Sequence, residues 1–189
     1  MSFPATAPTR SVPADRHDGL TIALHWATAV LVLAQFASAH VWELLPRGTP
    51  LRHALISTHA ALGIVFALVV LTRIVWRLAR PHALPPAGGP LERLAAGTVH
   101  LALYALLLAQ AVLGFLFGWS AGGGLRFFDL FSVPPLIVLG RENSHLLAEM
   151  HNAVAWTLIG VAELHAAAAL LHHHLLRDDV LRRMVYRSE

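Results

Sequence analysis

The sequence predicts an all-α membrane protein, a four-transmembrane-helix bundle with both termini in the cytoplasm. Of its 189 residues, 56% are hydrophobic and only 13% are charged, whereas about 25% of a soluble domain is charged. Four apolar runs are each long enough to cross the hydrocarbon core of a bilayer, which takes about 20 helical residues. The arginines gather in the segments that this fold would leave in the cytoplasm, as the positive-inside rule requires.

The four runs define the expected helices. They lie near 20–42, 55–77, 95–118 and 147–172, within a four-helix transmembrane domain of residues 19–176. Residues 1–18 are proline-rich and polar, which predicts a flexible cytoplasmic tail, and residues 177–189 form a charged cytoplasmic tail. The first apolar run begins near Leu20 and is too long for the core of a cleavable signal peptide.

The connections differ in length and composition. The segment 43–54 is short, and the segment 78–94 holds proline and glycine residues that stop helices. The segment 119–146 is the longest and contains three successive glycines followed by a pair of prolines. Within it, the residues LRFFDLF at 125–131 are predicted to lie in the membrane interface as a short amphipathic helix.

Arginine placement gives the orientation. With the N-terminus inside, the cytoplasmic segments hold ten arginines: Arg10, Arg16, Arg73, Arg77, Arg80, Arg93, Arg177, Arg182, Arg183 and Arg187. The outside segments hold four: Arg47, Arg52, Arg126 and Arg141. This bias predicts that both termini are cytoplasmic. The outside segments also carry four acids, Glu43, Asp129, Glu142 and Glu149, so their formal net charge is zero.

Histidines inside the apolar runs are the main functional signal. His151 and His165 are 14 residues apart, which is close to four helical turns and a rise of about 21 Å. Their side chains therefore share one face at two depths, and His172 follows on nearly the same face. Imidazole is a common metal ligand, and ionisable groups inside a membrane usually have a function.

Two further histidines match this pair in depth. His25 lies early in the first run, on the cytoplasmic side, and His59 lies early in the second run, on the outer side. The expected pairs are thus His59 with His151 outside and His25 with His165 inside, each able to hold one iron between two helices. A planar macrocycle with histidine above and below is the arrangement of a b-type haem.

Two residues near these pairs have alternative interpretations. His40 lies 15 residues after His25 and is a rival ligand at the outer end; its place beside Trp42 and Glu43 suits an interfacial residue better, although spacing alone does not exclude it. Gly63 lies one turn after His59 on the same face, where a missing side chain would admit a haem edge or a neighbouring helix.

Other polar residues follow the same faces at the inner end. Arg73 and Arg77 return to the face of His59 and would bind haem propionates or a quinone headgroup; alternatively, they anchor the helix at lipid phosphates. His172 would contact a quinone carbonyl and pass a proton. His100 begins the third run on the inner side and would contact a propionate or quinone, or lie in the interface.

Composition excludes several classes of site. The chain has no cysteine, which rules out disulfides, thiolate zinc sites, cysteine-bound iron–sulfur clusters and covalently attached c-type haem. Its basic residues form no patch interleaved with base-stacking aromatics, so no nucleic-acid partner is expected.

Five motifs distributed along the chain carry a family resemblance. They are LHW at 24–26, THAALGI at 58–64, HLALYALLLAQAVLG at 100–114, MHNAVAW at 150–156 and LHAAAALLHHH at 164–174. With these motifs the chain resembles the bacterial cytochrome b561 proteins of the inner membrane. The LHAAAALLHHH segment, followed by RDDVLRRM, is the most specific of the five.

The resemblance implies a four-helix bundle with two haems b. Its ligands would be His25, His59, His151 and His165, and Arg73, Arg77, His100 and His172 fall on positions that the family pattern shares. One type of member is a superoxide oxidase, which oxidises superoxide at the periplasmic face and reduces ubiquinone at the inner face. The chain departs from the family pattern at Glu163, two residues before an expected ligand, where a small residue would be typical.

Two other functions stay open at this point. The same haems would serve a cytochrome b anchor subunit that passes electrons between a periplasmic redox partner and the quinone pool, with residues 119–146 as the docking surface. A haem-free transporter of divalent metal or protons would use the histidines together with Glu163.

Overall fold

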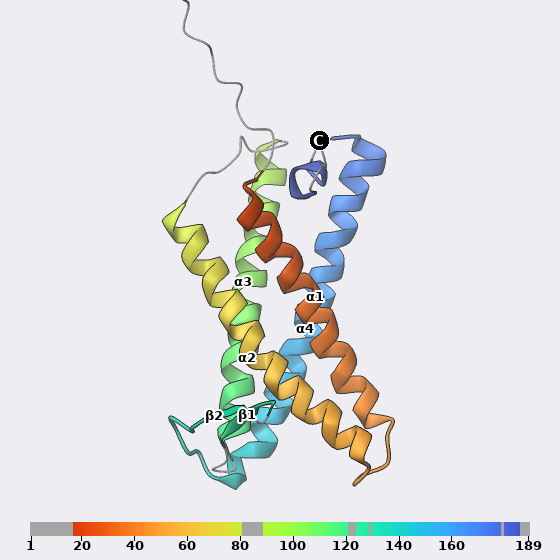
Figure 1. The fold of residues 1–189 in the computed structure, drawn as a ribbon. Helices are drawn as coiled ribbons and strands as arrows, with labels where there is room; N and C mark the ends of the chain where they lie inside the picture. The colour runs from red at the N-terminus through yellow and green to blue at the C-terminus, as the bar shows by residue number, and fades with distance from the viewer. Residues whose placement is uncertain (1–16, 81–88, 121–123, 129, 179, 186–189) are drawn as a thin grey trace, which may run out of the picture.

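The computed structural model describes residues 17–80, 89–120, 124–128, 130–178 and 180–185. Four long helices make up most of these residues: α1 (Gly19–Glu43), α2 (Pro50–Ala79), α3 (Pro90–Ser120) and α4 (Ser144–Leu171). Each is long and apolar enough to cross a membrane (Figure 1). The predicted all-α membrane fold is therefore confirmed. Most of the predicted tail 1–18, the glycines at 122 and 123, Asp129 and the last four residues lie outside the described part.

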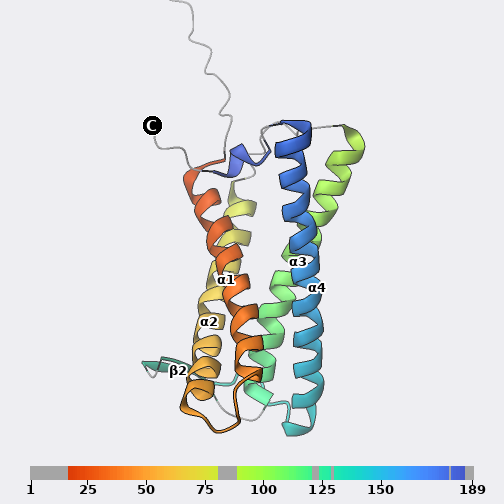
Figure 2. The ribbon, with the colours of Figure 1, turned by 90° about the vertical axis from the view of Figure 1, so that its right-hand side faces the viewer.

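The bundle consists of two antiparallel helix pairs. α1 packs along α2, α3 packs along α4, and α2 also contacts α3, as Figures 1 and 2 show. The two ends of the described chain meet at one end of the bundle. There the backbone N–H of His17 donates to the carbonyl of Arg183 over 3.3 Å, and Trp26 Nε1 donates to the carbonyl of Met184 over 2.8 Å.

The helices extend further than the hydropathy pattern predicts. α2 begins at Pro50 instead of near residue 55, because proline is well suited to the first turn of a helix. A short 3-10 turn, η1 (Arg141–Asn143), leads into α4. At α1, the Asp18 side chain accepts from the backbone N–H of Thr21 over 3.0 Å and caps the helix.

The predicted interfacial helix at 125–131 is wrong, because this segment contains a β-hairpin. Strand β1 (Leu125–Phe127) pairs antiparallel with β2 (Phe131–Val133), with Phe127 opposite Phe131. The two phenyl rings stack with centroids 4.9 Å apart. Aromatic cross-strand pairs favour strands, and glycines before the segment and prolines after it leave too few residues for a stable helix. β1 packs against α2 and α3.

A buried apolar layer joins three helices at the middle of the bundle. It consists of Phe66 and Val70 from α2, Leu107 from α3 and Leu158 from α4. Leu158 is seven residues from both His151 and His165, so the layer lies between the level of His151 and the level of His165. Many other leucines and valines are exposed on the outside of the bundle, as expected of helix faces in contact with lipid.

The last described residues form an irregular segment that covers the N-terminal end of α1. After α4 comes a π-helical turn, η2 (His172–Leu176), and Arg177 then adopts a left-handed conformation with φ of 54°. This conformation is a common way to end a helix. A last 3-10 turn, η3 (Arg182–Met184), supplies the carbonyls that His17 and Trp26 contact.

Candidate functional site

Two pairs of imidazoles face each other across the bundle at two levels. The ring centroids of His59 on α2 and His151 on α4 are 6.4 Å apart. At the other level, the ring centroids of His25 on α1 and His165 on α4 are also 6.4 Å apart. We call these the outer pair and the inner pair. They are the two pairs that depth matching predicts from the sequence.

The separation in each pair suits one metal ion between two imidazoles. A metal about 2 Å from each ligating nitrogen, with each centroid about 1 Å behind its nitrogen, places the centroids about 6 Å apart. Among the described residues, no group of three or more His, Asp or Glu side chains could hold a metal ion. A metal in either pair therefore needs further ligands from elsewhere, as the four nitrogens of a porphyrin provide to an iron with two axial histidines.

Ser38 fixes the tautomer of His59. The Ser38 hydroxyl donates to the carbonyl of Gln35 over 2.9 Å, and its oxygen lies 3.0 Å from Nδ1 of His59. Because its hydrogen is already committed, the hydroxyl accepts the Nδ1–H of His59. The lone pair of His59 is then on Nε2 and free for a metal, which is the usual arrangement behind a metal-bound histidine.

His151 has one supported ring nitrogen and one orphan. One ring nitrogen lies 3.0 Å from the side-chain amide of Gln110, while the other ring nitrogen and the Gln110 oxygen are buried without a partner. The amide nitrogen of Gln110 donates to Nε2 of His151, so this ring nitrogen carries the lone pair, and the buried Nδ1 carries a hydrogen without a partner. The outer pair therefore fits a metal ion by its spacing, and metal binding at Nε2 of His151 requires the Gln110 amide to turn away.

Two glycines make room around the outer pair. A Cβ at Gly114 on α3 would lie 3.2 Å from Cε1 of the His151 ring, and a Cβ at Gly63 on α2 would lie 3.4 Å from the Gln35 amide nitrogen. Gln35 donates from that nitrogen to the carbonyl of His59 over 3.1 Å. Gly63 thus admits the Gln35 side chain, which links α1 to the turn of α2 that carries His59.

Aromatic rings separate the rival His40 from the outer pair. His40 Nδ1 donates to the carbonyl of Phe36 over 2.8 Å, and its ring contacts the rings of Phe36 and Trp156. Trp42 instead contacts His59, with ring centroids 4.8 Å apart. The structure therefore places His40 in an aromatic cluster and leaves His151 opposite His59.

The inner pair has a cation beside it. Nη2 of Arg73 lies 3.1 Å from Nδ1 of His25, and the same guanidinium lies 5.3 Å from the centroid of the Tyr104 ring. The ring of His100 on α3 lies with its centroid 5.4 Å from that of His165. Two of the predicted accessory residues, Arg73 and His100, are thus next to the inner pair.

The Arg73 contact selects one tautomer of His25. A guanidinium only donates, so it faces Nδ1 when that nitrogen carries a lone pair and Nε2 carries the hydrogen. A metal bound at Nε2 requires the opposite tautomer. The inner pair therefore fits a haem iron by its spacing, and metal binding there requires the Arg73 side chain to turn away from Nδ1.

Arg77 and His172 lie at the inner end but outside the pair. Arg77 is exposed on α2, one turn beyond Arg73. It is close enough to His17 that, after burial, it is the largest cause of the lowered pKa of that imidazole. His172 Nδ1 lies 2.5 Å from Oδ2 of Asp178. Arg77 and His172 therefore lie at the same end of the bundle as the inner pair, but the structure does not gather them at one point.

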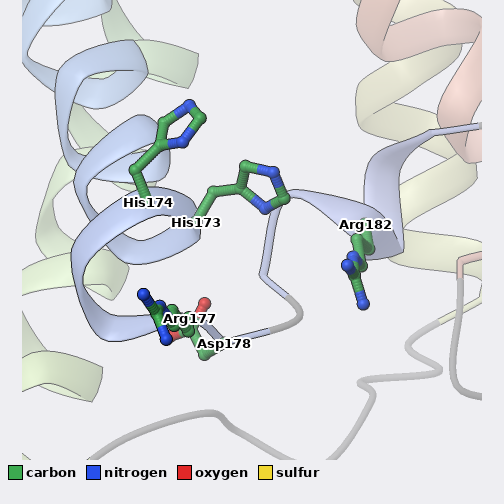
Figure 3. Close-up of a pocket in the computed structure, with 5 residues that line it drawn as sticks. All are labelled: His173, His174, Arg177, Asp178 and Arg182. Carbon is green, nitrogen blue, oxygen red and sulfur yellow. The ribbon is translucent and has the colours of Figure 1, made fainter.

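A polar cavity lies next to His172. Its volume is about 310 Å³, and it is lined by His173, His174, Arg177, Asp178 and Arg182. Figure 3 shows the two histidines on the last turn of the helix and Arg182 on the chain that returns toward α1. Neither Arg73 nor Arg77 lines this cavity, so it is separate from the inner pair.

Asp178 is held ionised at this cavity. Its slight burial acts to raise its pKa, but the hydrogen bonds from the His172 side chain and the Val180 backbone outweigh burial and lower the pKa below 3.8. Asp178 therefore contacts the His172 imidazole as a carboxylate at all but acidic pH. Glu163, the other acid that the sequence singles out, is exposed on α4.

Comparison with known proteins identifies the family of this chain. The model of a family described as "Prokaryotic cytochrome b561" matches residues 16–187. The chain belongs to the prokaryotic cytochrome b561 family. Membership makes it a membrane electron-transfer protein of the oxidoreductase type, and the family implies that it binds haem b.

Curated relatives of this cytochrome b561 family member cover nearly its whole length. It is 30% identical to "Cytochrome b561 homolog 2" of Escherichia coli K12 over 175 residues, which is 92% of this chain and 93% of the relative. It is 29% identical to "Cytochrome b561 homolog 1" of the same strain, over 93% of this chain and 99% of that protein. It is 28% identical to "Probable superoxide oxidase CybB" of Yersinia pestis, over 90% of this chain and 96% of that protein.

The sequence analysis missed the residues that support the histidines. Gln35, Ser38 and Gln110 lie in apolar runs, where uncharged polar side chains are often interhelical hydrogen-bonding groups. Their polar character in an apolar run is therefore a signal that they contact another helix. The spacing of residues along one helix does not predict which residues they contact. Gly114 gave no signal of its own, since glycine is frequent in transmembrane helices.

Proposed function

We propose that this protein is a superoxide:ubiquinone oxidoreductase of the bacterial inner membrane, with both termini in the cytoplasm. The outer pair (His59 and His151) and the inner pair (His25 and His165) would each hold one haem b. When bound, haem supplies one-electron transfer. The observation that carries the proposal is the equal 6.4 Å separation of the imidazoles at two levels of one bundle.

The proposed reaction balances with two superoxide ions for each quinone. Two superoxide ions each lose one electron at the periplasmic face and leave as two molecules of oxygen. Ubiquinone gains two electrons at the inner level and takes up two protons from the cytoplasm to become ubiquinol. The polypeptide forms no covalent bond with either substrate.

Residues at the inner end have roles in quinone binding and proton supply. Arg73 and Arg77 would donate hydrogen bonds to a quinone oxygen or to haem propionates, and His100 would do the same from α3. His172 would relay protons, and its contact with Asp178 supports this role because the carboxylate is near the surface of the cavity. A carboxylate–imidazole pair can pass a proton inward without large movement of the chain.

Exposed arginines at the outer end support an anionic donor. Arg47 follows α1, Arg126 is on β1 and Arg141 begins η1, and all three are exposed. Arg52 differs, because its guanidinium donates to the carbonyls of Trp42 and Leu45 at the end of α1. The acids of the same segments bring their formal net charge to zero, so attraction of a small anion depends on these arginines gathering around the entry site. The name of the Yersinia pestis relative points the same way.

A spectrum of the purified protein tests the proposal. Two haems b per chain, reduced by a superoxide-generating system and reoxidised by added ubiquinone, are expected. Addition of superoxide dismutase is the control and should abolish reduction. Two haems that stay oxidised under superoxide would reject this donor, and a chain without haem would overturn the assignment of both pairs.

The second candidate function is a cytochrome b anchor subunit for a periplasmic redox partner. Apolar side chains exposed between β2 and α4 favour it: Leu136, Ile137 and Val138. Together with the exposed Phe128 and Phe131, they offer a surface for another protein at the outer end. Co-purification of a redox subunit that reduces the haems would favour this function, and direct reduction by superoxide in the isolated chain would oppose it.

A further inference from the structure

We propose that the polar cavity between η2 and η3 binds the phosphate group of an anionic phospholipid. The volume of the cavity, about 310 Å³, is within the range of about 300 to 1,000 Å³ that is usual for small-molecule sites. Neither the outer pair nor the inner pair lines it. A ligand in this cavity is therefore independent of the electron transfer proposed for the two pairs.

The lining of the cavity suits an anion with several acceptor oxygens. Arg177 directly follows η2 and Arg182 begins η3, and both side chains are exposed. His173 and His174 add ring nitrogens from the end of the helix (Figure 3). The two arginines and Asp178 leave a formal charge of +1, without any proton on the imidazoles. A guanidinium binds phosphate through two parallel N–H donors.

The carboxylate in this lining has donors from the protein itself. Oδ2 of Asp178 lies 2.5 Å from Nδ1 of His172, and Oδ1 accepts from the backbone N–H of Val180 over 3.1 Å. These two contacts offset part of the negative charge of Asp178. They also hold the turn that brings Arg177 and Arg182 to the same cavity.

The position of the cavity favours a phospholipid as the source of the phosphate. The apolar span that contains α4 ends at Leu176, directly before Arg177, and phosphates of a bilayer lie just outside its hydrocarbon core. Basic pockets at this depth bind the headgroups of anionic lipids. Leucines beside the cavity in sequence are at least half exposed: Leu170, Leu171, Leu175 and Leu176. A phospholipid would cover these leucines with its acyl chains, whereas a soluble phosphate compound would leave them uncovered.

A phosphate in the cavity would hold the last described segment in place. It would contact Arg177 at the end of η2 and Arg182 on η3, and so join the two segments. η3 also supplies the carbonyls that accept from the backbone N–H of His17 and from Nε1 of Trp26. Bound anionic lipid should therefore protect the chain between η2 and η3 from proteolysis and keep η3 on the N-terminal end of α1.

Native mass spectrometry of the full chain in detergent tests the site. The protein is offered equal amounts of dioleoylphosphatidylglycerol and dioleoylphosphatidylcholine, which have the same acyl chains and differ in headgroup charge. We expect the wild-type chain to retain phosphatidylglycerol in preference to phosphatidylcholine. Arg177→Gln and Arg182→Gln should each weaken this retention about tenfold, as expected for the loss of one charge-assisted hydrogen bond.

Arg93→Gln is the matched control, because it removes the same charge at the same end of the bundle. Arg93 is exposed near the beginning of α3, which starts beside the N-terminal end of α1 (Figure 1), and it does not line the cavity. This variant should retain phosphatidylglycerol as the wild-type chain does. An equal loss of retention in Arg93→Gln and Arg177→Gln would mean that only overall charge matters, and would overturn the site.

Limited proteolysis with chymotrypsin, which does not cleave at arginine, provides a second readout. Phosphatidylglycerol should slow cleavage between η2 and η3 in the wild-type chain and in Arg93→Gln, and should not slow it in Arg177→Gln. Phosphatidylcholine should give no protection. If Arg182→Gln fails to fold, Arg177→Gln provides the same test from the other side of the cavity.

Two further results would overturn the inference. One is equal retention of phosphatidylglycerol by the wild-type chain and both cavity variants, which would place the lipid elsewhere. The other is protection by inorganic phosphate as strong as that by phosphatidylglycerol, which would assign the cavity to a soluble phosphate compound. Neither result concerns haem content or reduction by superoxide, so the proposed function is tested separately.

Discussion

The ring centroid of His165 lies 6.4 Å from that of His25. His151 lies 14 residues earlier on α4, and its ring centroid is 6.4 Å from that of His59. One helix, α4, therefore supplies one histidine of each pair. α1 and α2 then supply one partner each. α4 therefore contributes one histidine to each level, whereas α1 and α2 each contribute to one level only. The two sites are therefore separable by single substitutions.

Replacement of His25 by alanine should reduce the haem content from two per chain to one. The outer pair shares no side chain with the inner pair, so the remaining haem should keep its low-spin spectrum. The haem-to-protein ratio of the purified variant measures this, and His59→Ala is the reciprocal variant. Loss of both haems in each variant would contradict two separate sites.

Replacement of Gly114 by alanine should disturb the outer site. The new Cβ would lie 3.2 Å from the His151 ring, so the ring has to move. We expect weaker haem retention or an altered outer spectrum, measured by absorbance after gel filtration. Gly160→Ala on α4 is the matched control, because a Cβ there meets nothing within 4 Å; it should keep the spectrum and stabilise the helix by up to about 1 kcal/mol. An unaltered outer site in Gly114→Ala would show that the ring contact is unimportant.

Replacement of Leu158 by alanine should destabilise the bundle by about 2 kcal/mol. The side chain is 4% exposed and packs in the central apolar layer, so its removal leaves a cavity. Loss of the haem band on heating in detergent measures the effect. Leu164→Ala, at a position 71% exposed, is the control and should change stability by less than about 0.5 kcal/mol. Equal effects of the two substitutions would mean that the layer contributes no packing energy.

Acid should loosen the turn between η2 and η3, where Asp178 contacts His172 and the backbone N–H of Val180. The folded-state pKa of Asp178 is below its ordinary value of 3.8, so its contribution is present above that value and is lost as pH falls through the folded-state pKa. Limited proteolysis between η2 and η3 should therefore accelerate in acid with an acid-active protease and stay slow near neutral pH. Asp178→Asn should make cleavage fast and independent of pH. Slow cleavage of that variant at all pH values would show that the contact between Asp178 and His172 does not hold this turn.

The four ligand candidates were predictable from sequence because helix geometry alone relates His151 to His165. Depth matching then needs only the order of the helices and their alternation across the bilayer. Gln35, Ser38 and Gln110 were not predictable, since each contact joins residues on different helices and depends on how the helices are rotated. Arg73 was predicted to face a propionate or quinone, and its contact with His25 depends on a side-chain conformation that no spacing encodes.

The hairpin after α3 shows a second limit of the sequence analysis. The residues at 125–131 have the aromatic content of an interfacial helix, and a periodicity over so few residues is ambiguous between helix and strand. The pairing of Phe127 with Phe131 favours the hairpin over a helix. Such pairing is a contact between two strands, and the local sequence pattern does not predict it. α2 and α4 begin earlier than predicted, at Pro50 and Ser144. The reason is local, because a hydropathy pattern does not detect the polar first turn of a helix.

The central layer of Phe66, Val70, Leu107 and Leu158 has a consequence for energy conservation. A membrane that stores a proton gradient loses that gradient through any continuous file of water or hydrogen-bonding groups. The four side chains of this layer contain no such group, and they are buried where the two polar levels come closest along α4. Electrons tunnel through hydrocarbon over such distances, whereas protons need a donor and an acceptor at each step. In the proposed function, this packing would let electrons pass between the two levels and would offer protons no path through these four side chains.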